Sequence, residues 1–313
     1  MILKLEPQTL ANEFSQLGIH PASEAIFLHK SEIVPLKILD IRTPAANIIK
    51  QEMLACGGDC AIPAGCVVCA EERVDVILLG TYKHYARLLE KLTQMPYFGM
   101  AGIKSELMAI LDAPIPQTIL ADGRTLNYDK MLVMGILNIT PDSFYAGSRV
   151  PQLEQVVEKA GEMLRQGAAV LDIGGESTRP GSDAVTADEE QKRIVPVIKA
   201  LKERYPACVI SIDTYRASTA EAALAAGADI INDVTAMEGD AAMSDLVVGS
   251  KVPIILMHMR GTPKNMQQNC EYKNVVTEVA AYLLQRAKIL ENRGVAKEKI
   301  IFDPGIGFAK NIE

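Results

Sequence analysis

Polar side chains follow short apolar runs at regular places in the second half of the chain. Asp213, Asn232 and Asp303 each end such a run. Two carboxylates and a carboxamide can together accept and donate hydrogen bonds to a ring whose edge carries N–H groups. One buried Asp alone is as readily a structural cap or an ion-pair partner. Three such residues at strand ends favour a binding site for a small heterocycle.

Two loops add groups that could bind phosphate. Asn138 ends the apolar run 131–137 and opens the segment NITPDSF, a pattern that is also typical of a plain turn. Residues 174–181 read GGESTRPG, where two glycines allow a tight bend and Thr178 and Arg179 supply a hydroxyl and a guanidinium. A solvated loop with incidental charge is the alternative. We interpret the two loops as a site for a phosphate-bearing substrate.

From about residue 131 the chain repeats a short apolar strand, a polar loop and an amphipathic helix. Strands are expected at 131–137, 169–173, 209–213, 229–232, 253–257 and 300–303. Helices are expected at 153–166, 188–204, 217–226, 241–249 and 272–293. The strands are apolar throughout, as in parallel sheets buried on both faces, and their C-terminal ends carry the polar residues. This favours a TIM barrel over an open dinucleotide-binding sheet, and no GxGxxG follows the first strand.

Residues 1–128 do not fit this repeat and are expected to form a small α/β extension domain of unknown role. Local patterns predict a helix at 45–54, a strand at 75–79 and a helix at 82–92. The segment 114–128 is interpreted as a linker or as a capping hairpin at the closed end of the barrel. Residues 129–313 are expected to form the barrel, with about six of the eight strands that a (β/α)8 fold needs. The predicted barrel is therefore incomplete.

The composition limits the kinds of partner. The formal net charge is −7 and there is no basic run, so nothing supports a nucleic-acid interface. No apolar run approaches the roughly 20 residues needed to cross a bilayer, and the first residues lack the pattern of an export signal. We expect a cytoplasmic protein that acts on small molecules and keeps its cysteines reduced.

Four of the cysteines are grouped in the extension domain. Cys56, Cys60, Cys66 and Cys69 follow the pattern C-x3-C-x5-C-x2-C, which could bind zinc. Only the last pair has the usual separation of zinc ligands. We therefore interpret the four cysteines as small buried residues around a glycine-rich turn.

The two loops described above resemble the paired signatures of dihydropteroate synthases. The similarity extends over the strand ends from about residue 131 to residue 310. The resemblance implies a pterin-binding transferase of folate biosynthesis and a sulfonamide target. Such an enzyme condenses 7,8-dihydropterin-6-ylmethyl diphosphate with p-aminobenzoate, giving 7,8-dihydropteroate and diphosphate in an SN1-like, Mg²⁺-assisted reaction.

The resemblance also implies roles for particular residues. Asp213, Asn232 and Asp303 would hold the pterin, and Met257 would pack on its ring. Asn138 would bind the diphosphate through Mg²⁺.

Two further residues would contact the other substrate groups. Thr178 and Arg179 would lie beside p-aminobenzoate and the diphosphate and would form the catalytic set with Asp213. His258 and Lys310 are weaker candidates, since a hydrogen-bonded wall residue and a surface lysine explain them as well. Barrels of this kind often dimerise, so a homodimer is a candidate assembly.

The sequence departs from the family pattern at its end. The lysine after the seventh strand and the terminal Arg and His of the family cannot be assigned, and a fragment of a longer protein is the hypothesis. An open barrel would expose the edges of its first and sixth strands. A pterin-binding methyltransferase and a pterin-binding protein without turnover remain alternatives. The methyltransferase would not call for the Ser-Thr-Arg-Pro-Gly loop, and the binding protein predicts binding without turnover.

Overall fold

The computed structural model divides the chain into two compact units, residues 1–114 and 115–313. It describes residues 10–112, 115–139, 149–176, 185–261 and 270–311. The division lies earlier than the boundary predicted after residue 128. The reason is that β4 (Gln117–Ile119) and β5 (Thr125–Asn127) pair as an antiparallel hairpin that belongs to the second unit. The segment 114–128 thus contains the capping hairpin that was the alternative to a linker.

The first unit contains a three-stranded sheet with the strand order β1-β3-β2. Its strands are β1 (Val34–Arg42), β2 (Asp59–Ala61) and β3 (Arg73–Gly80). Its α-helices are α1 (Leu10–Leu17), α2 (Pro21–Ser31), α3 (Thr43–Cys56), α4 (Tyr82–Leu92) and α5 (Met100–Leu111). Side chains along β3 are alternately buried and exposed, because one face of the sheet packs against an apolar core that includes Ile49 and Leu88 of the helices. The predicted strand 75–79 and helices 45–54 and 82–92 lie within β3, α3 and α4.

The second unit contains a parallel six-stranded sheet whose spatial order follows the chain. Its strands are β6 (Val133–Asn138), β7 (Ala168–Gly174), β8 (Val209–Asp213), β9 (Ile230–Asp233), β10 (Ile254–Met257) and β11 (Ile300–Asp303). Each predicted strand is present, with ends that differ by a residue or two. An α/β architecture with strands added in sequence is that of a TIM barrel, here with six strands.

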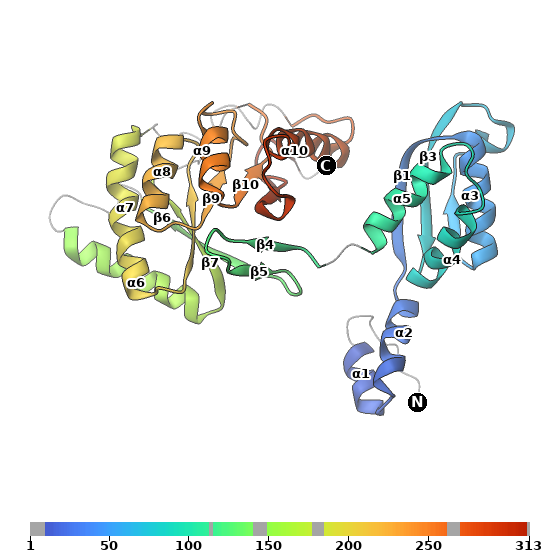
Figure 1. Cartoon of the computed structure of the whole chain (residues 1–313), viewed down its shortest axis with the longest axis horizontal. Coiled ribbons are helices and arrows are strands. Elements are labelled where there is room, and N and C mark those ends of the chain that lie inside the picture. The colour runs from blue at the N-terminus through green and yellow to red at the C-terminus, as the bar shows by residue number, and fades with distance from the viewer. Residues whose placement is uncertain (1–9, 113–114, 140–148, 177–184, 262–269, 312–313) are drawn as a thin grey trace. The chain divides into compact units, whose positions relative to one another are not determined.

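Helices alternate with these strands. They are α6 (Arg149–Arg165), α7 (Ala187–Arg204), α8 (Ala217–Ala226), α9 (Met243–Ser250) and α10 (Val275–Glu291), and Figure 1 shows them along one side of the sheet. The start of α7 illustrates why helices form where the sequence predicts them. The Thr186 side chain accepts a hydrogen bond from the Glu189 backbone N–H, and three acidic residues occupy the first turn.

The six strands alternate between an outer and an inner face. On the outer face, side chains such as Leu171 and Ile212 join the helices in the large core. On the inner face, a smaller cluster joins four strands with the hairpin through Val170, Val209, Ile230, Ile255 and Leu120. Leu120 is 2% exposed, so the hairpin closes the N-terminal end of the barrel interior. This contact places residues 115–128 in the second unit.

The strands at the two edges of the sheet, β6 and β11, expose apolar side chains. Ile136 on β6 is 58% exposed and Phe302 on β11 is 44% exposed. Within the described ranges, no further strand pairs with either edge. The exposed edges agree with the expectation for a barrel of six strands.

No helix in the described part of the chain is long and apolar enough to cross a membrane. Cys56, Cys60 and Cys66 are buried, whereas Cys69 is exposed. Burial raises the pKa of the Cys60 thiol to about 11, which keeps it protonated. Among the residues that the structure describes, no three His, Cys, Asp or Glu side chains are grouped closely enough to hold a metal ion.

Candidate active site

The inner face of the barrel changes from apolar to polar within one step of the strand period. Side chains two residues apart in a strand point to the same face, so the residues two positions after the apolar layer form a second layer on the inner face. It consists of Asp172, Ser211, Asn232, Met257 and Asp303. This layer brings together three of the residues predicted to hold the pterin.

Asn138 and Asp213 form a third layer nearer the mouth. Asn138 lies opposite Gly174 in the pairing of β6 with β7, and Gly174 lies opposite Asp213 in the pairing of β7 with β8. A Cβ at Gly174 would lie 3.2 Å from Oδ1 of Asn138 and 3.3 Å from Oδ2 of Asp213. The absent side chain therefore lets a carboxamide and a carboxylate approach each other across β7.

Asp172 is a site residue that the sequence prediction did not select. Its side chain is 5% exposed, and its Oδ2 accepts a hydrogen bond of 3.1 Å from Nδ2 of Asn232, which is 8% exposed. The available signal was a single carboxylate within the otherwise apolar strand β7. A buried acid in such a strand is costly unless it has a partner or a function.

Buried polar atoms without a protein partner gather in this layer. Oδ1 of Asp172, Oγ of Ser211 and Oδ1 of Asn232 are buried and make no hydrogen bond to any described residue. Leaving such atoms unpaired costs about 1–3 kcal/mol each. Three of them on adjacent strands mark a place built to receive hydrogen-bonding groups from a ligand.

Two carboxylic acids of the site, Asp213 and Asp172, have raised pKa values. Burial, and then the negative charges of Asp172 and Glu190, raise the pKa of Asp213 well above its usual range. Burial also raises the pKa of Asp172, against the opposing effects of the neighbouring Ser211 hydroxyl and of the hydrogen bond from Asn232. A ligand that brings N–H donors or positive charge would favour the ionised forms.

The other two predicted pterin residues adjoin each other. Met257, 2% exposed, lies opposite Asp303 in the pairing of β10 with β11. Oδ1 of Asp303 accepts a hydrogen bond of 2.7 Å from the Gly305 backbone N–H, which fixes the carboxylate. A flat ring beside Asp303 would meet the polarizable thioether of Met257.

Asp233, the residue next to Asn232, is a structural cap. Its carboxylate accepts hydrogen bonds from the Thr235 backbone and hydroxyl and from the Met237 backbone. The side chain is fully buried and faces away from the inner layer, as the strand period requires. Asp233 thus has the structural role that was considered as an alternative for a buried Asp at a strand end.

His258 and Lys310 connect the ends of β10 and β11. Nζ of Lys310 lies 3.0 Å from Nδ1 of His258 and donates to the carbonyl oxygens of Gly305 and Phe308. Burial lowers the pKa of both His258 and Lys310. Lys310 therefore holds the loop after β11 against the tip of β10, a contact that the sequence did not indicate.

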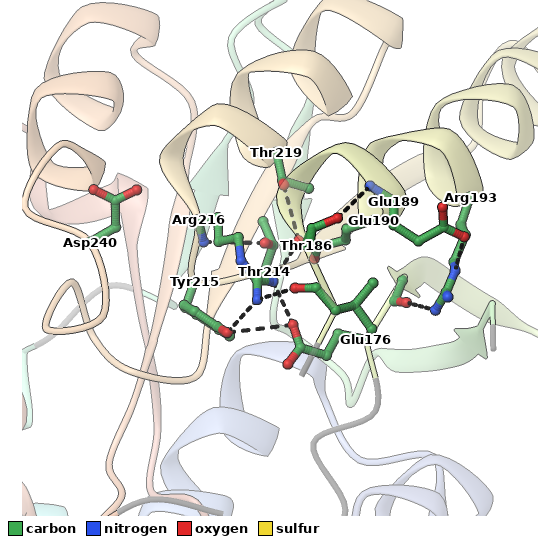
Figure 2. Close-up of polar contacts among 12 residues, drawn as sticks. Glu176, Thr186, Glu189, Glu190, Arg193, Thr214, Tyr215, Arg216, Thr219 and Asp240 are labelled. Atoms are coloured by element: carbon green, nitrogen blue, oxygen red, sulfur yellow. Dashed lines mark hydrogen bonds and ion pairs between the residues drawn. The ribbon is translucent and has the colours of Figure 1, made fainter. Parts of the chain in front are cut away.

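Thr178 and Arg179 lie outside the described residues. The structure describes the two ends of their loop, Glu176 and Val185. Figure 2 shows Glu176 within a polar network around Arg216, which begins α8. This network was not predicted.

Comparison with known proteins relates the chain to one enzyme family. A family model described as pterin binding enzyme matches residues 134–313. Dihydropteroate synthase of Escherichia coli is 40% identical over 194 residues, which cover 62% of this chain and 68% of that protein. The structure of Xanthomonas albilineans dihydropteroate synthase with 4-aminobenzoic acid has 40% identity and a TM-score of 0.56, and the match covers 63% of this chain and 69% of that one.

A longer relative aligns with part of the first unit as well. A probable bifunctional folylpolyglutamate synthase/dihydropteroate synthase of Haloferax volcanii is 37% identical over 278 residues, which cover 85% of this chain. The chain spans only 32% of the length of that relative. The match to the family model spans the region that carries the polar layers of the barrel. The chain therefore belongs to the dihydropteroate synthase family of pterin-binding enzymes.

Proposed function

We propose that this chain carries the pterin site of a dihydropteroate synthase, which joins 7,8-dihydropterin-6-ylmethyl diphosphate to p-aminobenzoate. The observation that supports this most directly is the set of unpaired buried atoms on Asp172, Ser211 and Asn232. A pterin ring offers N–H donors and ring acceptors along one edge, and it needs such partners when it is buried.

The reaction requires stabilisation of positive charge on the pterin. The bond between the pterin methylene carbon and the diphosphate oxygen breaks, and its electron pair leaves with the diphosphate. The lone pair of the p-aminobenzoate amine then forms the new C–N bond, and one amine proton is released. The side chains of Asp213 and Asp303 are proposed to accept hydrogen bonds from the N–H groups of the pterin and so to stabilise the cation.

The donor set at the mouth is suited to Mg²⁺. Oδ1 of Asn138 and Oδ2 of Asp213 lie on either side of Gly174, and both are the hard oxygen donors that this ion prefers. Since few protein ligands are present, the diphosphate oxygens would complete the coordination, as is usual for Mg²⁺ with phosphates. Bound there, Mg²⁺ would neutralise charge on the departing diphosphate.

Thr178 and Arg179 are proposed to contact p-aminobenzoate and the diphosphate. Their support is their place in the GGESTRPG segment, directly after β7. A guanidinium matches carboxylate and phosphate oxygens in pairs of hydrogen bonds. The cytoplasm is the proposed compartment, because the buried cysteines Cys56, Cys60, Cys66 and Cys208 are free thiols.

The test is product formation by the complete product of the gene that encodes this chain. With the pterin diphosphate, Mg²⁺ and labelled p-aminobenzoate, we expect labelled dihydropteroate, and a sulfonamide should compete with p-aminobenzoate. Asp303→Asn should abolish most of the activity. Asp245→Asn is a matched control, since Asp245 is exposed and pairs only with Arg293 among the interactions described here. Pterin binding without incorporation of p-aminobenzoate would instead favour a methyltransferase or a binding protein.

A further inference from the structure

The loop after β11 is held by a lysine whose side chain turns back into it. Nζ of the half-buried Lys310 lies 3.1 Å from the carbonyl oxygen of Gly305 and 3.0 Å from that of Phe308. It also lies 3.0 Å from Nδ1 and 3.4 Å from the carbonyl oxygen of His258, the residue directly after β10. The three N–H donors of an ammonium group are thus matched by three carbonyl oxygens and a ring nitrogen, which leaves none for a ligand. Lys310 therefore acts on the protein around it and not on a substrate.

Gly305 is the residue through which this lysine reaches the polar layer. The Gly305 backbone N–H donates to Oδ1 of Asp303 at 2.7 Å, and its carbonyl oxygen accepts from Lys310. A Cβ on Gly305 would lie 2.1 Å from the carbonyl oxygen of His258 and 3.2 Å from Cγ of Met257, so the glycine packs directly against the end of β10. The position of this one residue thus sets both the direction of the Asp303 carboxylate and the wall beside Met257.

The backbone of the loop would not hold this position by itself. Gly305 and Gly307 both have positive φ, and glycine has the largest conformational freedom to lose on folding. Ala309 has φ +51°, in the left-handed region that is unfavourable for a residue with a Cβ. Its carbonyl oxygen accepts a hydrogen bond of 2.9 Å from the Tyr272 hydroxyl. Side-chain contacts such as these are needed to select one conformation of the loop.

A lysine at the other end of β11 shows a purely structural version of the same contact. Lys299, directly before β11, donates at 3.2 Å to the carbonyl oxygen of Ile119 in β4 and at 2.6 Å to that of Lys251, before β10. Neither acceptor adjoins a residue of the polar layers in the chain. The partners of Lys310 differ, because His258 follows Met257 and Gly305 bonds to Asp303.

We propose that Lys310 is a positioning residue for the pterin. It fixes Gly305, and through Gly305 it orients the Asp303 carboxylate and shapes the wall beside Met257. The proposal rests on the proposed function, in which Asp303 and Met257 contact that ring. Without the ammonium group, three carbonyl oxygens lose a donor and the loop can turn away from β10. The Asp303 carboxylate would then lose the N–H that orients it, so it would no longer be preorganised for the ligand.

The test is calorimetric titration of the complete gene product with 6-hydroxymethylpterin. Lys310→Met should raise Kd about tenfold or more, because the carboxylate partner of the ring is no longer held in place. Lys299→Met is the matched control, since it removes the same ammonium group from carbonyl oxygens at the opposite end of β11. Both substitutions should lower the unfolding temperature, but Lys299→Met should leave Kd within about twofold. Equal Kd values in wild type and Lys310→Met would overturn the proposal.

A double-mutant cycle separates positioning from a general loss of stability. Asp303→Asn should itself weaken binding, and Lys310→Met added to it should raise Kd further by less than about threefold, since the carboxylate that Lys310 orients is absent. A loop that is merely less stable would lower the affinity by the same factor in both backgrounds. An equal effect of Lys310→Met with and without the Asp303 carboxylate would therefore also overturn the proposal.

Lys310→Arg keeps the proposal testable if Lys310→Met fails to fold. The guanidinium keeps the charge, but its planar donors cannot converge on carbonyl oxygens that surround one point, so Kd should rise about threefold. Where only Lys310→Arg folds, an unchanged Kd would refute the positioning role.

Calorimetry needs no turnover, so the outcome is separable from that of the proposed function. A wild type that binds the pterin but forms no dihydropteroate would refute the proposed function, while the Kd values of the variants would still decide the role of Lys310. Normal synthesis with equal Kd values would refute the role of Lys310 alone. A wild type that binds no pterin would refute both.

Discussion

Nδ2 of Asn232 donates a hydrogen bond to Oδ2 of Asp172 at 3.1 Å, across the strand that lies between their own strands. The bond satisfies one end of each side chain. It leaves Oδ1 of Asp172 and Oδ1 of Asn232 buried and without a partner in the described part of the chain. The pair is therefore oriented with its free oxygens available to a ligand.

Asp172→Asn should weaken pterin binding by about tenfold or more, while the unliganded protein becomes no less stable. The amide keeps the shape and can still accept from Asn232, but it cannot ionise beside a ligand N–H group. Calorimetric titration with 6-hydroxymethylpterin would measure the affinity. Asp229→Asn is a control for which the opposite result is expected, because Asp229 pairs with Arg124 and Lys202 at the other end of the barrel. It should lower stability and leave the affinity unchanged.

Because the pKa of Asp213 is raised, the stability of the unliganded protein should depend on pH, and the sign of that dependence can be derived. The folded state binds the proton more tightly than the unfolded state, where the pKa is about 3.9. This contribution to stability is fully present below that value and is lost as pH rises through the folded pKa. Asp213→Asn should remove it. The mutant should therefore gain stability over wild type progressively as pH rises from about 4.

Urea unfolding of wild type and Asp213→Asn at several pH values would measure this difference. Taking the difference between the two proteins cancels the contributions of other acids, such as Asp75, whose pKa is lowered mainly by its hydrogen bond with Lys37. If the difference in free energy of unfolding between the two proteins did not change with pH, the pKa of Asp213 would not be raised.

Gly305→Ala should cost about 2 kcal/mol or more of stability. Its φ is +63°, and a Cβ there would lie 2.1 Å from the carbonyl oxygen of His258, so the loop after β11 would have to move. Gly307→Ala is the matched control, since Gly307 also has positive φ, at +95°, but a Cβ would meet no atom within 4 Å. Thermal unfolding should show a clearly larger loss for Gly305→Ala. Equal losses would mean that the contact with His258 relaxes freely.

Leu120→Ala should destabilise the second unit by about 2–5 kcal/mol, because it opens a cavity under the inner apolar layer. Chemical denaturation followed by circular dichroism would measure the loss. Ile115→Ala serves as the control, since Ile115 is exposed. If Leu120→Ala were as mild as Ile115→Ala, the hairpin would not be part of the barrel core.

Asn138→Ala should raise the Mg²⁺ concentration needed for half-maximal activity of the complete gene product. The reason is that the carboxamide oxygen of Asn138 and Oδ2 of Asp213 lie on either side of Gly174, where both could bind the ion. Activity measured against Mg²⁺ concentration provides the comparison, with Asn292→Ala at the C-terminus of α10 as a control. An unchanged Mg²⁺ dependence would remove Asn138 from the metal site.

Much of the barrel could be predicted because its signals are local. Six apolar runs of strand length and the intervening helical patterns correspond to β6 to β11 and α6 to α10. Thr186 marks the start of α7 by a cap that needs only neighbouring residues. The first unit was harder, since β1 pairs with β3 across a long stretch of sequence that no local pattern reveals.

The site residues whose positions depend only on where a strand ends could be predicted from the sequence. Asn138, Asp213, Asn232, Met257 and Asp303 do lie at the polar end of the barrel interior. Their assigned roles stay predictions.

Some of the site depends on contacts that sequence does not report. Asp172 was missed because a carboxylate inside an apolar strand has no turn or motif to mark it. The Arg216 network was missed because its partners are distant in sequence. The boundary after residue 128 was placed late because the burial of Leu120 depends on strands that follow it.

The unpaired oxygens of the polar layer connect the supply of substrate to the survival of the protein. An unliganded barrel carries the free-energy cost of Asp172, Ser211 and Asn232 in every folded molecule. A bound pterin removes that cost, which contributes to its binding free energy, and a ligand at a hundredfold excess over Kd stabilises the folded state by about 2.7 kcal/mol. In cells that contain little pterin, the protein would then unfold and be degraded faster, so its abundance would follow the supply of pterin.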